Sequence, residues 1–345
     1  VSIGAETSRD AADWLAFHVE DERTRAVGLF LEAVRRPVAF RAALERAADA
    51  GKPVVVLKVG RSEVAARNAM AHTGAIVGSD QSFDALCRSY GAIRVDDYCD
   101  WIEQLEVLGT PRRPRGLRTV LLTNSGGEAE LVADVSDAAG MPLMTLPADL
   151  AAEIDAAWPF HGVHNPIDYW AFGEPEEIVP DLVRRCAEHP EVDNVVINID
   201  QSWRFTNGER ENAEDACTTM ADVALATDTF CAVLSTAVSD PSDAAVLNAV
   251  RGGVPVLIGA GMGMRAIARA AQWRPTKPEL PAPWDKPACP ELEREAGHLA
   301  EADAKVVLGR YGVRAPRELR AANPAEARAA AERINATVVV KVDGP

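Results

Sequence analysis

Apolar residues follow two alternating patterns along most of the chain. Short, almost continuous apolar runs bounded by Gly, Pro or charged residues, such as KPVVVLKVG at 52–60, predict buried strands. Between them, apolar residues recur every three or four positions, as in RPVAFRAALERAADAG at 36–51, which predicts a helix that ends at Gly51. Strands that are apolar on both faces and alternate with helices are typical of parallel sheets covered by helices on both sides. The pattern therefore predicts an α/β fold with doubly wound parallel sheets.

Applied along the whole chain, the two patterns give a complete set of expected elements. The predicted strands cover residues 25–34, 52–60, 92–95, 117–124, 141–146, 192–200, 229–236, 254–259 and 336–342. The predicted helices cover residues 36–51, 62–71, 82–91, 96–108, 125–140, 176–190, 211–226, 242–253, 263–274, 298–313 and 323–335. The segment HNPIDYW at 164–170 is predicted to be a loop.

Two proline-rich segments divide the series of elements. GTPRRPRG at 109–116 combines prolines with a basic cluster, and the segment 275–293 contains six prolines, which is typical of an extended linker. The chain ends directly after the predicted strand 336–342, and a lone strand cannot bury its faces, so we expect a fragment of a longer polypeptide. The predicted organisation is a first α/β domain at 1–112, a second at 113–274, a linker at 275–293 and an incomplete third domain at 294–345.

Composition and charge exclude several classes of protein. Of 345 residues, 48% are hydrophobic and 26% charged, as in ordinary globular proteins, and the formal net charge is −16. So acidic a surface repels phosphate backbones and anionic membranes, so we expect neither nucleic acid nor membrane as a partner. No apolar run approaches the roughly 20 residues that span a bilayer, and no signal-peptide pattern opens the chain. The six scattered cysteines form no CxxC motif and indicate reduced thiols in a cytoplasmic protein.

Two glycine-containing turns each follow a predicted strand and open a predicted helix. They are VGRSE at 59–63 and TNSGGEAE at 123–130. The start of a helix has free N–H groups and a partial positive charge, so it favours phosphate, and glycine lets the backbone approach closely. The candidate phosphate-binding residues in these turns are Gly60, Arg61, Ser62, Ser125, Gly126 and Gly127.

A single histidine, His72, lies among small residues in AMAHTGAIVGSD, followed by Thr73 and Gly74. Neutral imidazole is nucleophilic near pH 7, and two helix starts directed at one imidazole would stabilise a phosphohistidine. Glu32 ends the predicted strand containing GLFLE, where a carboxylate could accept the other ring N–H and fix the tautomer. Thr73 and Gly74 are therefore added to the candidate phosphate-binding residues.

These residues resemble a known family. The stretch LFLEAV, with GKPVVVLKVGRSEVAARNAMAHTGAIVGSDQSFDALCRSYGAIRVDD, is similar to the ligase domain of NDP-forming acyl-CoA synthetases, which are relatives of succinyl-CoA synthetase. LLTNSGGEAELVADVSDAAGMPL and HNPIDYW resemble their second flavodoxin-like domain. EADAKVVLGRYGV and ATVVVKVDGP resemble the opening of their ATP-grasp domain. The resemblance covers nearly the whole chain and implies two flavodoxin-like domains followed by the start of an ATP-grasp domain.

The resemblance also implies a reaction and a role for each candidate residue. In this family a carboxylic acid, ATP and coenzyme A give acyl-CoA, ADP and phosphate, and a histidine carries the phosphoryl group between distant sites. By position, His72 is that histidine and Glu32 its orienting carboxylate. Ser125, with the two glycines after it, matches the second phosphate-facing helix start, and Lys341 matches the first nucleotide-binding lysine.

The same resemblance implies ATP/ADP and coenzyme A as cofactors, Mg²⁺ only with the nucleotide, and no resident metal site. The family's CoA-binding domain and most of its ATP-grasp domain are not matched, so we expect this fragment to be inactive alone. We also expect a homo-oligomer or a complex with the remaining domains, with a small carboxylic acid as the substrate.

Other interpretations stay open for the same residues. His72 could be a surface-loop histidine, Glu32 a strand-end surface acid, and Lys341 an exposed strand lysine. Glu128 places an additional carboxylate in the second glycine turn, which is unfavourable beside a phosphate unless it points to solvent. A metal pair at His161 and His164 lacks a third ligand, and neither GxSxG nor a P-loop occurs.

Two other classes of function compete with the ligase. The first is a non-catalytic, synthetase-like regulatory module of a protein acetyltransferase, in which the phosphohistidine is lost, so the presence of His72 argues against it. The second is a flavodoxin-type small-molecule-binding domain, for which flavin absorbance would be the evidence.

Overall fold

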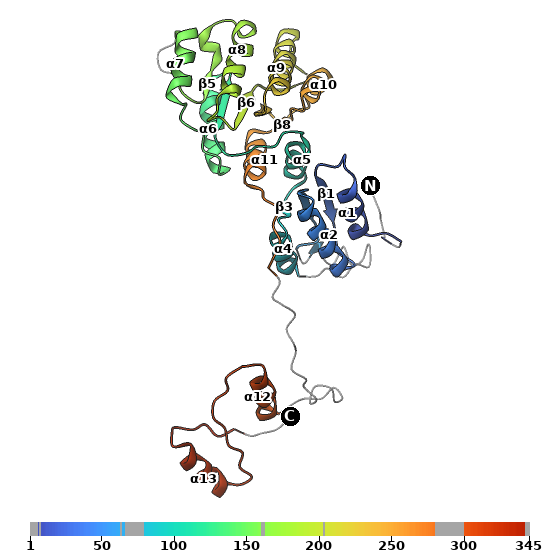
Figure 1. Cartoon of the computed structure of the whole chain (residues 1–345), viewed down its shortest axis with the longest axis vertical. Helices are drawn as coiled ribbons and strands as arrows, with labels where there is room; N and C mark the ends of the chain where they lie inside the picture. The colour runs from blue at the N-terminus through green and yellow to red at the C-terminus, as the bar shows by residue number, and fades with distance from the viewer. Residues whose placement is uncertain are drawn as a thin grey trace. The chain divides into compact units, whose positions relative to one another are not determined.

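The chain divides into two compact units, Val1–Pro278 and Glu279–Pro345, in a computed structural model (Figure 1). Each unit is described by itself. The structure describes residues 6, 8–62, 64–65, 79–159, 163–202, 204–279 and 300–341.

The first unit begins with a three-stranded parallel sheet in the order β1-β2-β3. Its strands are β1 (Val27–Leu31), β2 (Val54–Lys58) and β3 (Ile93–Val95). Every residue of β2 is buried, as expected of a central strand covered on both faces. Its helices are α1 (Ala11–Glu20), α2 (Pro37–Asp49), α4 (Asp80–Ser89) and α5 (Tyr98–Gly109). The first three share one apolar cluster with the sheet, and α5 packs in a second cluster.

The second sheet of this unit has five parallel strands in the order β5-β4-β6-β7-β8. Its strands are β4 (Thr119–Thr123), β5 (Ile167–Asp168), β6 (Asn194–Asn198), β7 (Phe230–Ser235) and β8 (Val256–Ile258). Numbered from its own first strand, the order is 2-1-3-4-5, the flavodoxin order. The sequence-based prediction of two flavodoxin-like α/β domains is confirmed.

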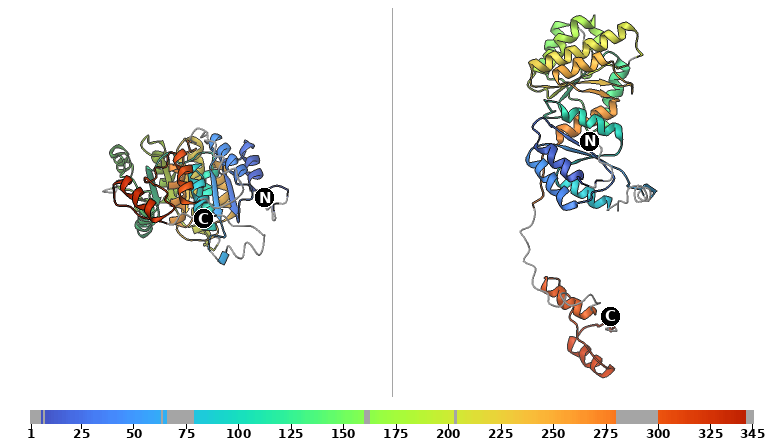
Figure 2. Two further views of the ribbon diagram at one scale, coloured as in Figure 1. Left: turned by 90° about the horizontal axis from the view of Figure 1, so that it is seen from below. Right: turned by 90° about the vertical axis from the view of Figure 1, so that its right-hand side faces the viewer.

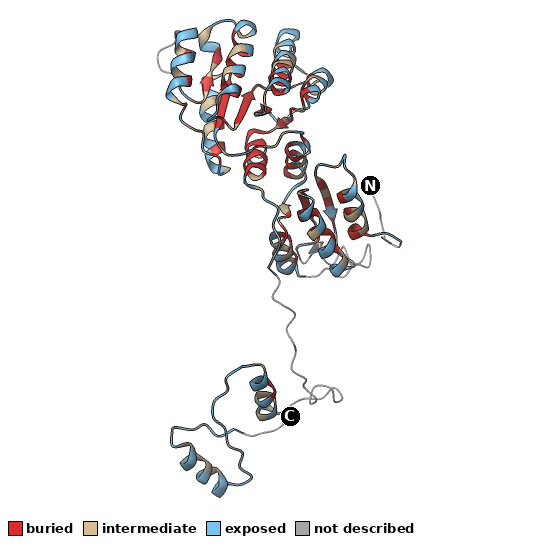
Figure 3. Ribbon diagram, viewed as in Figure 1, coloured by how far each residue is buried: buried red, intermediate tan, exposed pale blue. Residues whose placement is uncertain are grey.

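Helices cover both faces of the second sheet, as Figure 2 shows from two further sides. They are α6 (Gly126–Ala138), α7 (Ala148–Ala157), the 3₁₀ helix η1 (Tyr169–Phe172), α8 (Pro175–Glu188), α9 (Asn207–Ala226), α10 (Asp243–Gly252) and α11 (Ala260–Gln272). Figure 3 shows the strands buried and the outward faces of the helices exposed. Helices α9 and α10 pack so closely that a Cβ added to Gly252 would lie 2.4 Å from the Cα of Ala221.

Helices α5 and α11 lie side by side between the two sheets and join their cores (Figure 1). One apolar cluster runs from Val55 of β2 through Leu108 of α5 and Met264 of α11 to Leu257 of β8. The side-chain amide of Gln104 on α5 donates to the carbonyl of Ala266 on α11 at 3.1 Å. The first sheet therefore buries one face against α5, and α5 in turn packs on α11, a helix that the chain supplies after the second sheet.

The predicted strand 141–146 is wrong, because these residues form no strand in the structure. The edge strand beside β4 is β5, which lies in the segment predicted to be a loop. The side chain of Asn165 explains the exchange, because its amide oxygen accepts from the N–H of Leu121 at 2.9 Å and its nitrogen donates to the carbonyl of Thr119 at 2.7 Å. The same nitrogen donates to Met144 at 2.9 Å, so this side chain replaces a backbone ladder between 141–146 and β4.

Two helices, α1 and α7, were not predicted. Helix α1 begins at Asp10, whose side chain accepts from the N–H of Ala12 at 3.0 Å and forms a capping box with Asp13. Apolar side chains lie on more than one side of this helix, since Leu15 is fully buried while Phe17 is exposed. A short helix with so little polar contrast gives a weak periodic signal.

The second unit contains two helices among its described residues, α12 (Glu301–Arg310) and α13 (Pro324–Ile334). Val307 is its one buried hydrophobic residue in this described part. The predicted strand 336–342 is wrong over its described residues 336–341, which are not in a strand. A strand needs a neighbouring strand to satisfy its backbone groups, and no strand is present among the described residues of this unit.

Candidate functional site

The second glycine turn lies at the carboxyl end of β4, beside the carboxyl end of β6. In a sheet of this order the crevice between these two strands is the position where ligands bind. Ser125 begins α6, and its hydroxyl accepts from the N–H of Glu128 at 3.4 Å. Gly126 and Gly127 are exposed, and the structure places a Cβ on Gly127 in open space. The turn therefore presents the free start of a 13-residue helix at the expected ligand position.

Glu128 points toward the sheet and not toward solvent. Its carboxylate accepts from the side-chain nitrogen of Asn198, the last residue of β6, at 2.8 Å. Asn198 is fully buried, and its amide oxygen accepts from the hydroxyl of Thr236 at 3.0 Å. Asp200 lies in the same region and accepts from the N–H of Ala237 at 2.9 Å. This network lines the crevice between β4 and β6 with polar groups from the start of α6 and from the carboxyl ends of β6 and β7.

Burial and the nearby charge of Asp200 raise the pKa of Glu128, while the hydrogen bond from Asn198 lowers it. A carboxylate in the first turn of a helix is favoured by the helix dipole, but here it faces other acids in a partly buried position. Asp168 adds a third carboxylate, 3.6 Å from the position of a Cβ on Gly126. The arrangement therefore opposes an anion most strongly while Glu128 is ionised.

The first glycine turn lies at the carboxyl edge of the first sheet, next to Glu32. Gly60 is buried with a φ of 78°, a conformation that favours glycine, at the sharp turn out of β2. The buried ammonium of Lys58 donates to the carbonyls of Glu32 and Val59, both at 3.1 Å. Ser62 accepts from the N–H of Ala65 at 3.2 Å, as a residue that begins a helix does.

Cations gather around this first turn. Arg61 hydrogen-bonds Asp96 and forms an ion pair with Asp80 at 3.4 Å. Arg94 of β3 binds the same Asp80 at 2.9 Å. Burial lowers the pKa of Lys58, with Asp80 opposing the effect. The carboxyl edge of the first sheet therefore carries three basic side chains, and the two arginines are paired with the carboxylates of Asp80, Asp84 and Asp96.

The structure brings together Glu32 and the first turn, while the Ser125 turn lies on the other sheet. His72, Thr73 and Gly74 lie outside the described residues, as does His161. Lys341 belongs to the second unit, where its exposed ammonium pairs with Glu301 at 3.1 Å.

Sequence reasoning missed two residues of these edges, Lys58 and Asn198. Each is the last residue of an otherwise apolar buried strand, in VVVLK and NVVIN. A polar residue that ends a fully buried strand is the available signal, because the carboxyl ends of parallel strands face the ligand side of the sheet.

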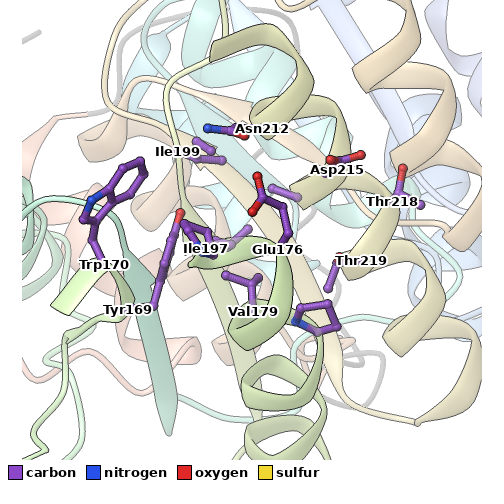
Figure 4. Close-up of a pocket in the computed structure, with 13 residues that line it drawn as sticks. Tyr169, Trp170, Glu176, Val179, Ile197, Ile199, Asn212, Asp215, Thr218 and Thr219 are labelled. Atoms are coloured by element: carbon purple, nitrogen blue, oxygen red, sulfur yellow. The ribbon is translucent and has the colours of Figure 1, made fainter. Parts of the chain in front are cut away.

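A pocket of about 220 Å³ opens on the other side of β6, between η1, α8 and α9 (Figure 4). Ile197 of β6 and Ile199 just after it form its apolar floor. Figure 4 shows Glu176 between Tyr169 and the helix that carries Asp215. These carboxylates form no ion pair with a described residue. Their negative charge makes the pocket unsuited to phosphate, CoA or a carboxylate substrate.

Two kinds of feature are absent from the described part of the chain. No helix there is both long and apolar enough to cross a membrane. No group of three or more His, Cys, Asp or Glu side chains in the same residues is arranged to hold a metal ion.

The chain matches three family models, one after another along its sequence. Residues 1–108 match a succinyl-CoA ligase like flavodoxin domain, residues 119–204 a Ligase-CoA domain, and residues 291–345 an ATP-grasp domain. A trans-feruloyl-CoA synthase from an unknown prokaryotic organism is 31% identical over 350 residues, covering 99% of this chain and 48% of that protein. The chain belongs to the NDP-forming acyl-CoA synthetase family.

Other members of the family show the same relation. The ADP-forming 4-hydroxybutyrate–CoA ligase of Nitrosopumilus maritimus is 26% identical, covering 100% of this chain and 50% of that ligase. A dinucleotide forming acetyl-coenzyme A synthetase of Ca. Korarchaeum cryptofilum, solved in complex with phosphate and ADP, is 26% identical with a TM-score of 0.65. That comparison covers 79% of this chain and 58% of the synthetase. The chain thus spans about half the length of the curated relatives that match it throughout.

Proposed function

We propose that this chain is the phosphoryl-carrying part of an ADP-forming acyl-CoA synthetase. The complete protein joins a small carboxylic acid to coenzyme A with ATP, and releases ADP and phosphate. Mg²⁺ acts with the nucleotide, and His72 carries the phosphoryl group between the ATP-grasp site and the acyl site. The observation that carries the proposal is the match to a trans-feruloyl-CoA synthase over 99% of the chain.

The geometry of the two sheet edges supports the assignment of roles. The Ser125 turn offers free helical N–H groups at the ligand position of a flavodoxin-order sheet, and the Gly60 turn offers basic side chains at another sheet edge. Both kinds of donor stabilise the charge on the equatorial oxygens during phosphoryl transfer. Glu32 is proposed to orient the imidazole, and Lys341 to bind the nucleotide.

The test is formation of phosphohistidine. The complete protein is incubated with ATP and Mg²⁺, and phosphopeptides are identified by mass spectrometry under alkaline conditions, which preserve a phosphoramidate. We expect acid-labile, base-stable phosphate on His72, absent in the His72→Ala variant and unchanged in the matched control His18→Ala. A His72→Ala protein with the wild-type rate of acyl-CoA formation would exclude the mechanism.

Glu32 is tested separately, because it is proposed to act through the histidine. Glu32→Gln keeps the shape of the side chain and removes the charge that favours one imidazole tautomer. We expect phosphorylation of His72 to slow by about ten- to a hundredfold, with nucleotide binding unchanged. Equal rates in Glu32→Gln and the wild type would leave Glu32 as a surface acid.

The regulatory-module alternative gains nothing from the relatives described above, which are CoA ligases or synthetases by name. It predicts no phosphate on His72 in folded, nucleotide-bound protein.

We further propose a cytoplasmic homo-oligomer, or a complex with chains that supply the remaining domains. The proposed domain boundaries stay at 1–112, 113–274, 275–293 and 294–345. Size-exclusion chromatography with light scattering, on the complete protein, tests the assembly.

A further inference from the structure

A second pocket of the first unit is lined by arginines and lies away from the proposed phosphoryl-transfer machinery. Its volume is about 750 Å³, within the range of small-molecule sites. Its charged lining residues, here called the arginine pocket, are Arg25, Arg112, Arg113, Arg115, Arg274 and Asp228. Arg25 precedes β1, the 110–115 segment precedes β4, and Asp228 precedes β7. The pocket therefore lies at the amino-terminal edge of the strands, opposite the edge that carries the two glycine turns.

The five arginines have no carboxylate partner among the described residues. In a chain with a net charge of −16 this is unusual, since Arg36, Arg94 and Arg185 each pair with two carboxylates. Asp228 also forms no described ion pair, so the lining retains a local charge of +4. Like charges held together are unfavourable unless an anion joins them.

Packing explains the position of some of these arginines but not of all. Arg113 donates to the carbonyl of Arg25 at 2.6 Å and lies over the ring of Trp273, with its Cζ 5.7 Å from the ring centroid. Arg112 and Arg274 reach backbone carbonyls at helix ends. The exposed side chains of Arg25 and Arg115 bond to no described residue. Backbone carbonyls leave the charge uncompensated, and burial together with the charge of Arg25 lowers the pKa of Arg113.

We propose that the arginine pocket binds the polyphosphate group of a small anion, such as pyrophosphate or a nucleoside diphosphate. Guanidinium groups bind phosphate oxygens through paired, charge-assisted hydrogen bonds. The uncharged lining residues are Thr110, Pro111 and Pro114, with no aromatic side chain to stack on a base. Recognition is therefore of the phosphates and not of the nucleobase. Because the lining comes from both flavodoxin-like domains and their connection, the bound anion links the two domains.

The test is calorimetric titration of the 345-residue chain with pyrophosphate at low salt. In the double variant Arg25→Ala/Arg115→Ala, whose two side chains make no described contact, we expect affinity to fall about tenfold or more. The matched control Arg41→Ala removes another exposed arginine without a described ion pair, on α2, and should bind as the wild type. Asp228→Asn removes the opposing charge and should tighten binding about two- to fivefold, a gain that misfolding cannot mimic.

Two further titrations identify the chemistry. ADP should bind the pocket as pyrophosphate does, adenosine should not bind it, and high salt should weaken both anions. Unchanged pyrophosphate affinity in the double variant would place the anion elsewhere and overturn the proposal, as would adenosine binding as tightly as ADP. His72→Ala should leave these affinities unchanged, so failure of the phosphohistidine test and failure of this one are distinguishable.

Discussion

Glu128 lies in the first turn of α6, where the helix dipole favours a negative side chain, yet its carboxyl group is half-buried among other acids. Burial and Asp200 raise its pKa, so the folded chain holds the proton more tightly than the unfolded chain does. The stability that this proton contributes is complete at low pH and is lost as rising pH ionises the group. The hydrogen bond from Asn198 partly offsets the loss.

Two substitutions separate the charge of Glu128 from its hydrogen bond. Glu128→Ala leaves the fully buried amide of Asn198 without an acceptor, and we expect unfolding free energy to fall by about 1–3 kcal/mol. Glu128→Gln keeps an acceptor of the same shape and removes the charge, so it should be neutral or stabilising at pH 7. Urea unfolding of the 345-residue chain measures both. Equal losses in the two variants would show that the charge, and not the acceptor, is required.

The sequence predicts the local part of this site and not the part that depends on distant residues. Ser125 could be predicted as a helix start, because it accepts from an N–H three residues ahead. The bond between Glu128 and Asn198 joins residues 70 positions apart, and its existence depends on the strand order. The sequence left open whether Glu128 points to solvent, and the structure shows that its carboxylate faces the crevice.

Helix α5 covers the open edge of the second sheet as well as one face of the first. The carboxylate of Glu103 accepts from the N–H of Ile258 in the edge strand β8 at 3.0 Å. Only 6% of Glu103 is exposed, and burial raises its pKa to about 7, with the hydrogen bond from Ile258 opposing the shift and nearby acids adding to it. The backbone N–H of Ile258 would otherwise be unpaired at the edge of the sheet, and it instead donates to a side chain of the neighbouring domain.

Ionisation of Glu103 makes the free energy of unfolding of the two packed domains depend on pH. Its folded-state pKa of about 7 lies above the ordinary value of 4.5, so its favourable contribution is complete below about pH 4.5 and is lost as pH rises through 7. Between pH 5 and 8 we expect the wild type to lose up to about 3 kcal/mol relative to Glu103→Gln, which keeps an acceptor for Ile258. Urea unfolding across this range measures it.

The matched control for this pH dependence is Glu130→Gln, an exposed position on α6. Its unfolding free energy should follow that of the wild type at each pH. A constant difference between the wild type and Glu103→Gln from pH 5 to 8 would contradict the assignment to Glu103.

Elements were predicted wherever their own residues carry the pattern, as in β2 and α2. The error at 141–146 arose because an apolar run does not reveal its neighbour. Met141 is fully buried there, as a strand residue would be, but the Asn165 side chain takes the positions on β4 that a ladder would use. The two-residue strand β5 is too short for any alternation to be visible.

The described parts of the first unit are united by the cluster that joins both sheets. Met264 on α11 is fully buried within it. Met264→Ala should lower the unfolding free energy by about 2–5 kcal/mol, and hydrogen exchange should rise in both β2 and β6. Leu44→Ala, whose side chain packs only in the outer cluster of the first sheet, should affect β2 more than β6. A rise confined to β6 in Met264→Ala would show that the domains unfold separately.

The sequence predicts two α/β domains but not that helices α5 and α11 join their cores. The count of strands, their apolar character and the glycine turns give the fold class and the flavodoxin-like likeness. That α5 packs on α11 depends on contacts across more than 150 residues, such as Gln104 with Ala266, 162 positions apart. The sequence of each of these helices, taken alone, has the hydrophobic pattern of an ordinary amphipathic helix.

The packing of α5 on α11 also constrains how the chain can be made. On the ribosome, residue 266 is added about 8 to 32 seconds after residue 104 at ordinary elongation rates. During that interval the nascent first domain has its strands and α5 but lacks α11, the helix that packs on α5. Side chains such as Leu108, which are buried in the complete fold, are then exposed to water until α11 is added. Slower codons between the two helices would lengthen that exposure.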